Sequence, residues 1–248
     1  INIPSVRFSL ETVVYDILAK EKELPLAKYC NTNAKTEIPV NGIAGVHFPG
    51  EGFSVIKVKV GYRNLFDEIE NMEYLSESFG SEVCFRLDAN GIFDLPQAIR
   101  FCKEMETFNI DYIEQPLPAH NLEDLEELSY HTEIPIAVDE SLTDFNSAEK
   151  IIDEQAAQVF VIKPMVSGGF SECKKIIHLA QAENIRTVIT SSLETSIGRE
   201  ACLHLILSNE ITEVCGLATG CFLAEDKPLN PILDGKIRIF DRHGLGVV

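Results

Sequence analysis

Residues 159–189 read VFVIKPMVSGGFSECKKIIHLAQAENIRTVI and contain the repeating unit that decides the fold. The runs at residues 159–162 and 187–189 are apolar at nearly every position. Such runs are typical of strands that are buried on both faces of a parallel sheet. The stretch between them, residues 169–183, carries apolar residues at helical spacing. The segment therefore predicts a strand, a helix and a second, parallel strand.

The same alternation begins at residue 40 and continues through most of the chain. The other β-rich runs lie at residues 40–44, 54–60, 82–87, 111–113, 136–138 and, more weakly, 214–218. The other helix-patterned stretches lie at residues 66–79, 95–108, 122–130, 147–154 and 195–208. Eight strands with intervening helices predict a TIM-type α/β barrel. A doubly wound open sheet is the alternative, although no G-x-G-x-x-G follows the first strand.

The two ends of the chain do not fit this repeat. Pro4 can start a helix that continues through Ile17, whereas residues 24–27 read as a loop. Residues 1–38 are therefore expected to be the end of another domain that packs on the barrel. Near the other end, the pattern predicts a turn at residues 234–235 and a returning strand at residues 236–240.

Composition and charge exclude several classes of protein. The 248 residues are 45% hydrophobic, which is enough for one sizeable core. The 21 Lys and Arg against 39 Asp and Glu give a net charge of −18, which disfavours nucleic acid and anionic membranes as partners. No apolar run approaches the roughly 18 residues of a membrane span, so we expect no membrane insertion.

The cysteines indicate a reducing compartment. The chain has seven, an odd number, at scattered positions and without a C-x-x-C pair. This pattern disfavours a secreted disulfide framework or a zinc ribbon. Because no secretory signal is visible either, we expect free thiols and a cytoplasmic location.

Ionisable residues stand at the carboxyl ends of the predicted strands, where an α/β barrel has its active site. Lys57 and Lys59 alternate with apolar residues, so both face the same side of their strand. The following four strands end in Asp88, Glu114, Asp139 and Lys163, at intervals of 24 to 29 residues counted from Lys59. Because each interval is about one strand–helix unit, these side chains are expected at one rim of the barrel.

Three carboxylates from adjacent strands repel one another unless a cation lies between them. Oxygen ligands without His or Cys suit a hard divalent ion, Mg²⁺ or alternatively Mn²⁺. Lys59 and Lys163 would then flank the ion, and either is a candidate for a neutral general base. Such a site suits removal of a proton α to a carboxylate, with the metal stabilising the enediolate. Taken singly, an acidic residue here is more often a helix cap and a strand lysine more often blunts an edge.

Six motifs resemble those of the enolase superfamily, muconate lactonizing enzyme subgroup. They are IKVKVG at 56–61, RLDANG at 86–91, IEQP at 113–116, VDES at 138–141, VIKP at 161–164 and TSSLETSIG at 190–198. Within this subgroup the chain is most similar to the o-succinylbenzoate synthases. Residues 4–10 (PSVRFSL) resemble the last helix of their capping domain, and residues 216–226 (GLATGCFLAED) resemble their strand-8 segment.

The resemblance implies a role for each site residue. Asp88, Glu114 and Asp139 would ligate Mg²⁺. Lys59 would be the catalytic base, with Lys57 keeping the local field positive, and Lys163 would stabilise the enediolate from the opposite face. The substrate-binding residues would be Asn90, which also helps to line the metal site, Thr190, Ser191 and the backbone at Gly216.

The resemblance also implies a small carboxylate substrate and a reaction. A 2-succinyl-6-hydroxy-cyclohexadiene-1-carboxylate would lose its α-proton and then water, giving 2-succinylbenzoate in menaquinone biosynthesis. The same lysines serve two-base racemisation in N-succinylamino acid racemases and epimerases, which is the alternative function. Dipeptide epimerases usually carry D-x-D after strand 8, where this chain has GLATG at 216–220. A catalytically inactive barrel acting as a binding module is the non-enzyme alternative.

Family members have a (β/α)7β barrel preceded by an α+β capping domain. The resemblance therefore implies that residues 1–38 are the end of that cap, that residues 39–230 are the barrel with the active site, and that residues 231–248 return towards the cap. Because the chain starts with Ile rather than Met, we expect further cap residues upstream. The oligomeric state is left open.

Overall fold

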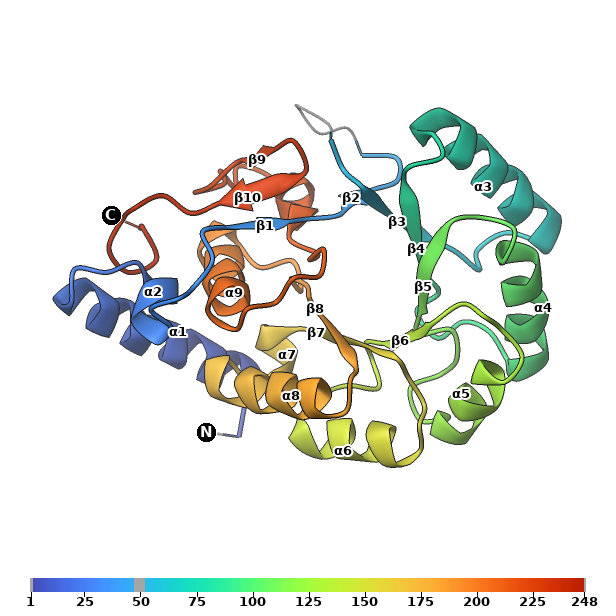
Figure 1. The fold of residues 1–248 in the computed structure, drawn as a ribbon, viewed down its shortest axis with the longest axis horizontal. Coiled ribbons are helices and arrows are strands. Elements are labelled where there is room, and N and C mark those ends of the chain that lie inside the picture. The colour runs from blue at the N-terminus through green and yellow to red at the C-terminus, as the bar shows by residue number, and fades with distance from the viewer. Residues whose placement is uncertain (1, 47–51, 248) are drawn as a thin grey trace.

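The centre of the computed structural model, which describes residues 2–46 and 52–247, is a curled parallel sheet of seven strands (Figure 1). The strands are β2 (Gly42–Ile43), β3 (Val55–Lys59), β4 (Cys84–Asp88), β5 (Ile110–Glu114), β6 (Ile136–Val138), β7 (Val159–Ile162) and β8 (Arg186–Ile189). Neighbours in the sheet follow one another in the chain, so the strand order never reverses. A doubly wound sheet requires such a reversal, so the predicted α/β barrel fold is confirmed.

Helices cover the outer face of this sheet. They are α3 (Leu65–Phe79), α4 (Leu95–Met105), α5 (Leu122–Ser129), α6 (Phe145–Asp153), the short α7 (Pro164–Ser167), α8 (Phe170–Ala182) and α9 (Ser196–Ser208). Figure 1 shows α3, α4, α5 and α6 following one another around the outside of the strands. The starts of α3 and α4 are encoded locally, since Asn64 and Asp94 accept hydrogen bonds from the backbone N–H three residues on.

The predicted eighth strand at residues 214–218 is wrong as a strand. Cys215 and Gly216 form isolated bridges to Val40 and Thr190, and residues Ala218–Phe222 form the 3-10 helix η1. A Cβ on Gly216 would lie 2.4 Å from Thr190 Oγ1, so the close approach to β8 requires glycine. The segment still joins the two edges of the sheet, because it makes backbone hydrogen bonds to both sides.

The strands have two apolar sides. The inner side holds a small buried cluster of Tyr112, Ala137, Val159, Val161 and Val188, while the larger core lies between the strands and the helices. Side chains alternate between the two sides of a strand. The next inward positions towards the carboxyl ends are therefore Glu114, Asp139, Lys163 and Thr190.

The predicted N-terminal helix is α1 (Pro4–Glu21). It packs on α8, where the rings of Phe8 and Tyr15 lie 6.4 and 5.2 Å from that of Phe170. Its other face exposes Val6, Leu10, Val13, Val14 and Ile17.

Residues 24–27 are not simply a loop, because α2 (Leu26–Cys30) begins among them. The N–H of Ala27 donates to Nδ1 of His204 on α9 at 2.9 Å. This tertiary contact supports the first turn of a helix that the local sequence does not indicate.

The C-terminal segment returns to the N-terminal one. β10 (Lys236–Arg238) pairs with β9 (Ile232–Leu233) and, on its other edge, with β1 (Glu37–Pro39). The turn predicted at Asp234 and Gly235 is confirmed, and both have positive φ, as a two-residue hairpin turn of this hand requires. The strand is shorter than the predicted range.

Across the described residues, none of the helices has the length and apolar character that a bilayer crossing demands. All seven cysteines are free, as expected. Burial raises the pKa of Cys102 and of Cys215 to about 12, which disfavours the thiolate form of both.

Candidate active site

The structure brings the predicted lysines and carboxylates together at the carboxyl ends of β3 to β7. In the sheet register, Lys59 lies opposite Asp88, and Asp88 opposite Glu114. Lys57 Nζ lies 2.8 Å from Asp88 Oδ2 and 2.7 Å from Glu114 Oε2, and Lys59 Nζ lies 2.7 Å from Asp88 Oδ2. Lys163 contacts Asp139 directly. We call these six side chains the lysine–carboxylate cluster.

The lysines compensate the negative charge of the three carboxylates. Each carboxylate of the cluster has an ammonium partner, so the negative charges are compensated by the chain itself. As placed, no three Asp, Glu, His or Cys side chains of the described residues form a group that could hold a metal ion. The charge balance of the cluster therefore does not by itself require a metal.

The chemistry of the donors nevertheless suits a hard divalent ion. The three carboxylates supply oxygen ligands from adjacent strands, and Asp88 and Asp139 both raise the pKa of Glu114 electrostatically, so the three interact. A cation bound among them would compete with the ammonium groups for these oxygens.

Burial sets the protonation of the cluster. It is the main cause that raises the pKa of Glu114 to about 7, against the opposing effect of Lys57. Burial by itself would lower the pKa of Lys57, but the carboxylates of Glu114 and Asp88 raise it above its usual range. For Asp88, burial is outweighed by Lys57 and Lys59, and the pKa is lowered. Lys57 is thus held as an ammonium and is not a candidate for a neutral base.

Asn90 connects Lys59 to a residue that the sequence analysis did not place in the site. Its Oδ1 accepts from Lys59 Nζ, and its Nδ2 donates to Glu140 Oε1 at 2.9 Å. The left-handed backbone of Asn90, with φ of 47°, turns its side chain towards both. Glu140 directly follows a predicted metal ligand, and that position is the signal that would have found it.

Gln115 was also missed, although it follows Glu114 in the chain. It is fully buried, and its Oε1 accepts from the backbone N–H of Asp139 at 3.1 Å and of Ser141 at 3.0 Å. Its Nε2 donates to the carbonyl of Leu117 and to Ser141 Oγ, both at 2.9 Å. Gln115 therefore ties the end of β5 to the turn that carries Asp139.

Replacing Gln115 by Leu is expected to lower the free energy of unfolding by about 2–4 kcal/mol, because buried backbone groups lose their partners. Urea denaturation measures this. Gln181→Leu, at an exposed position of α8, is the matched control and should change stability by at most about 0.5 kcal/mol. Equal stabilities for the two variants would contradict the role of Gln115.

The other predicted substrate contacts, Thr190, Ser191 and Gly216, form a separate group. Thr190 Oγ1 donates to the carbonyl of Gly216 at 3.0 Å, and Ser191 Oγ contacts Thr219 Oγ1. In the described part of the chain, no hydrogen bond joins Thr190, Ser191 or Gly216 to the lysine–carboxylate cluster. These residues mark the closing edge of the sheet, beyond β8.

The fold and this cluster define an α/β-barrel protein whose ionisable side chains gather at the carboxyl ends of its strands. Residues 48–248 match the enolase C-terminal domain-like family. The chain therefore belongs to the enolase superfamily, as the motifs indicated.

Three relatives show the range of functions among similar proteins. The L-amino acid-D/L-Glu epimerase of Francisella philomiragia is 29% identical over 84% of this chain and 62% of its own. The o-succinylbenzoate synthase of Desulfotalea psychrophila is 28% identical over 94% of this chain and 67% of its own. The N-succinyl-L-Arg/Lys racemase of Bacillus cereus is 25% identical over 85% of this chain and 60% of its own. The crystal structure of that racemase superposes on this chain with a TM-score of 0.89, covering 98% of this chain and 69% of the racemase chain.

The chain thus spans about three fifths to two thirds of the length of these curated relatives. A synthase, an epimerase and a racemase are thus similar to this chain at nearly the same sequence identity.

Proposed function

We propose that this protein is an o-succinylbenzoate synthase, a lyase that dehydrates 2-succinyl-6-hydroxy-cyclohexadiene-1-carboxylate in menaquinone biosynthesis in the cytoplasm. The observation that carries the proposal is the lysine–carboxylate cluster, in which lysines approach the carboxylates from β3 and from the end of β7. A synthase relative matched over 94% of the chain supports the substrate class. GLATG at 216–220, in place of D-x-D, disfavours the dipeptide epimerases.

Asp88, Glu114 and Asp139 would hold Mg²⁺, or Mn²⁺ in its place. The ion would supply stabilisation of the negative charge that develops on the substrate carboxylate. Lys57, held between Asp88 and Glu114, would remain an ammonium and keep the local field positive.

Lys59 is the best candidate for the base. Its side chain is 54% exposed, against 21% for Lys57 and 26% for Lys163, so it is the most accessible of the three to a substrate above the rim. It would take the α-proton of the substrate at Nζ. Lys163 would face the developing charge from the opposite side and stabilise it as an ammonium. Asn90, Thr190, Ser191 and the Gly216 backbone would contact the substrate.

Product analysis tests this function. The protein is incubated with Mg²⁺ and either the cyclohexadiene carboxylate or an N-succinylamino acid, and NMR follows formation of 2-succinylbenzoate and exchange of the α-proton. We expect kcat/KM for dehydration to exceed that for racemisation. Faster racemisation would instead support the alternative, an N-succinylamino acid racemase or epimerase, which the epimerase and racemase relatives favour. Failure to turn over either substrate would leave the binding-module alternative.

Metal removal is the second test. EDTA is expected to abolish activity, and Mg²⁺ or Mn²⁺ to restore it, because substrate charge at the rim then lacks a counter-ion. EDTA saturated with Mg²⁺ beforehand is the control. Full activity after exhaustive chelation would refute the metal assignment.

We also propose the division into residues 1–38, 39–230 and 231–248. The backbone N–H of Leu26 donates to the carbonyl of Gly244 at 2.8 Å, and that of Leu245 donates to Asp16 Oδ1 at 2.7 Å. With the pairing of β1 and β10, these bonds support a unit built from both ends of the chain beside the barrel.

A further inference from the structure

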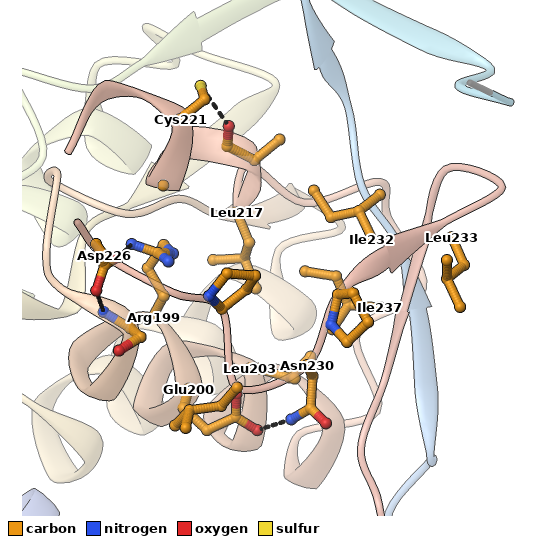
Figure 2. A pocket seen from close by; sticks show the side chains of 16 residues that line it. Arg199, Glu200, Leu203, Leu217, Cys221, Asp226, Asn230, Ile232, Leu233 and Ile237 are labelled. Carbon is orange, nitrogen blue, oxygen red and sulfur yellow. Dashed lines mark hydrogen bonds and ion pairs between the residues drawn. The ribbon is translucent and has the colours of Figure 1, made fainter. Parts of the chain in front are cut away.

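A cavity of about 470 Å³ lies outside the sheet, between α9, η1 and the β9–β10 hairpin (Figure 2). Its wall is mainly aliphatic and includes Leu203, Leu217, Ile232 and Ile237. Of the described residues that line it, none is one of the ten proposed site residues. The cavity therefore does not belong to the lysine–carboxylate cluster, and its volume suits a small molecule.

The positively charged group in the wall already has partners within the chain. Arg199 on α9 donates from Nη1 to the carbonyl of Glu194 at 2.8 Å, and the same atom lies 2.6 Å from Asp226 Oδ2. Figure 2 shows Arg199 and Asp226 together at one side of the cavity. Nη1 of the guanidinium is thus committed to partners within the chain, which offset part of its positive charge.

Two of the polar groups that remain, the Glu200 carboxyl and the Asn230 amide oxygen, are hydrogen-bond acceptors. Glu200 is 4% exposed, and one of its carboxyl oxygens accepts from Asn230 Nδ2 at another side of the cavity (Figure 2). The nearest imidazole nitrogen, His204 Nε2, is 3.6 Å away, which is too long for a hydrogen bond. Within the described part of the chain, Glu200 Oε2 has no hydrogen-bond partner, and the buried Asn230 Oδ1 has none either.

We propose that this cavity binds a small apolar molecule that carries one protonated amino group, with the ammonium at Glu200 and Asn230 and the apolar body against the aliphatic wall. A buried carboxyl and an unpaired amide oxygen both require a donor, and an ammonium has three. An anion would add a further acceptor to this group. The net charge of −18 also attracts cations to the protein.

Three probes of one shape test the proposal by isothermal titration calorimetry. They are cyclohexylmethylamine, the neutral cyclohexylmethanol and the anionic cyclohexanecarboxylate. We expect the amine to bind at least about tenfold more tightly than the alcohol, because its hydrogen bonds are charge-assisted, and the carboxylate not to bind. Equal affinities for all three, or no saturable binding of the amine, would overturn the proposal.

Two variants test whether the amine binds in this cavity. Glu200→Gln keeps the shape and should lower amine affinity to that of the alcohol, while Glu183→Gln, at an exposed position, should leave it unchanged. Ile232→Trp, on the half-buried wall of β9, should block both the amine and the alcohol by filling the space. Unchanged amine affinity in either Glu200→Gln or Ile232→Trp would overturn the site. These measurements are independent of turnover, so they do not depend on the proposed function.

Discussion

Replacing Lys59 by Ala is expected to lower kcat by about 10²–10⁴-fold, the usual contribution of a positioned general base. Lys59 has the accessible ammonium of the cluster, and Asn90 holds it from the side. Its loss leaves no nitrogen on β3 that can take the α-proton, because Lys57 is held by two carboxylates. Binding of a substrate analogue is expected to fall much less than kcat.

The control for this variant is Lys236→Ala on β10. Lys236 is also 54% exposed and also pairs with a carboxylate, Glu37, but it lies outside the cluster. Its removal is expected to leave kcat unchanged. The decisive measurement is deuterium wash-in at the α-carbon of both enantiomers of an N-succinylamino acid. If Lys59→Ala exchanged both at the normal rate, Lys59 would not be the base.

Replacing Arg86 by Met is expected to lower the free energy of unfolding by about 3–5 kcal/mol, because one partner of a buried ion pair is removed. Arg86 is 1% exposed inside the barrel. Its Nε donates to Asp111 Oδ2 at 2.7 Å, its Nη1 donates to the carbonyl of Val214 at 2.6 Å, and its guanidinium lies 4.6 Å from the centre of the Tyr112 ring. The bond to Val214 also holds the segment that joins the two edges of the sheet.

Arg238→Met on β10 is the matched control, because Arg238 pairs with Glu37 while its side chain is 72% exposed. A solvent-exposed ion pair contributes at most about 1 kcal/mol to stability, so the free energy of unfolding of this variant should stay close to that of the parent protein. Urea denaturation of both variants gives the comparison. A loss below about 1 kcal/mol for Arg86→Met would show that the buried pairs are dispensable.

The local sequence pattern was sufficient to predict most strands and helices of the barrel. Runs such as Val159–Ile162 are buried on both sides, and the helix between β7 and β8 repeats its apolar residues at helical spacing, so each element is encoded within its own stretch. The pattern failed at residues 214–218, where the strand is reduced to two bridges. There the close approach to Thr190 matters more than the propensity of the segment.

The sequence by itself determined which chemistry gathers at the rim, since alternation along each strand places Lys59, Asp88, Glu114, Asp139 and Lys163 on the inner side at the strand ends. It did not determine how these charges are satisfied, because the reach of a side chain across strands depends on register and on burial. Only the tertiary structure decided that the lysines neutralise the carboxylates and that Gln115 holds the turn of Asp139. The cavity beside Glu200 likewise arises between segments distant in the chain, whose packing no local pattern encodes.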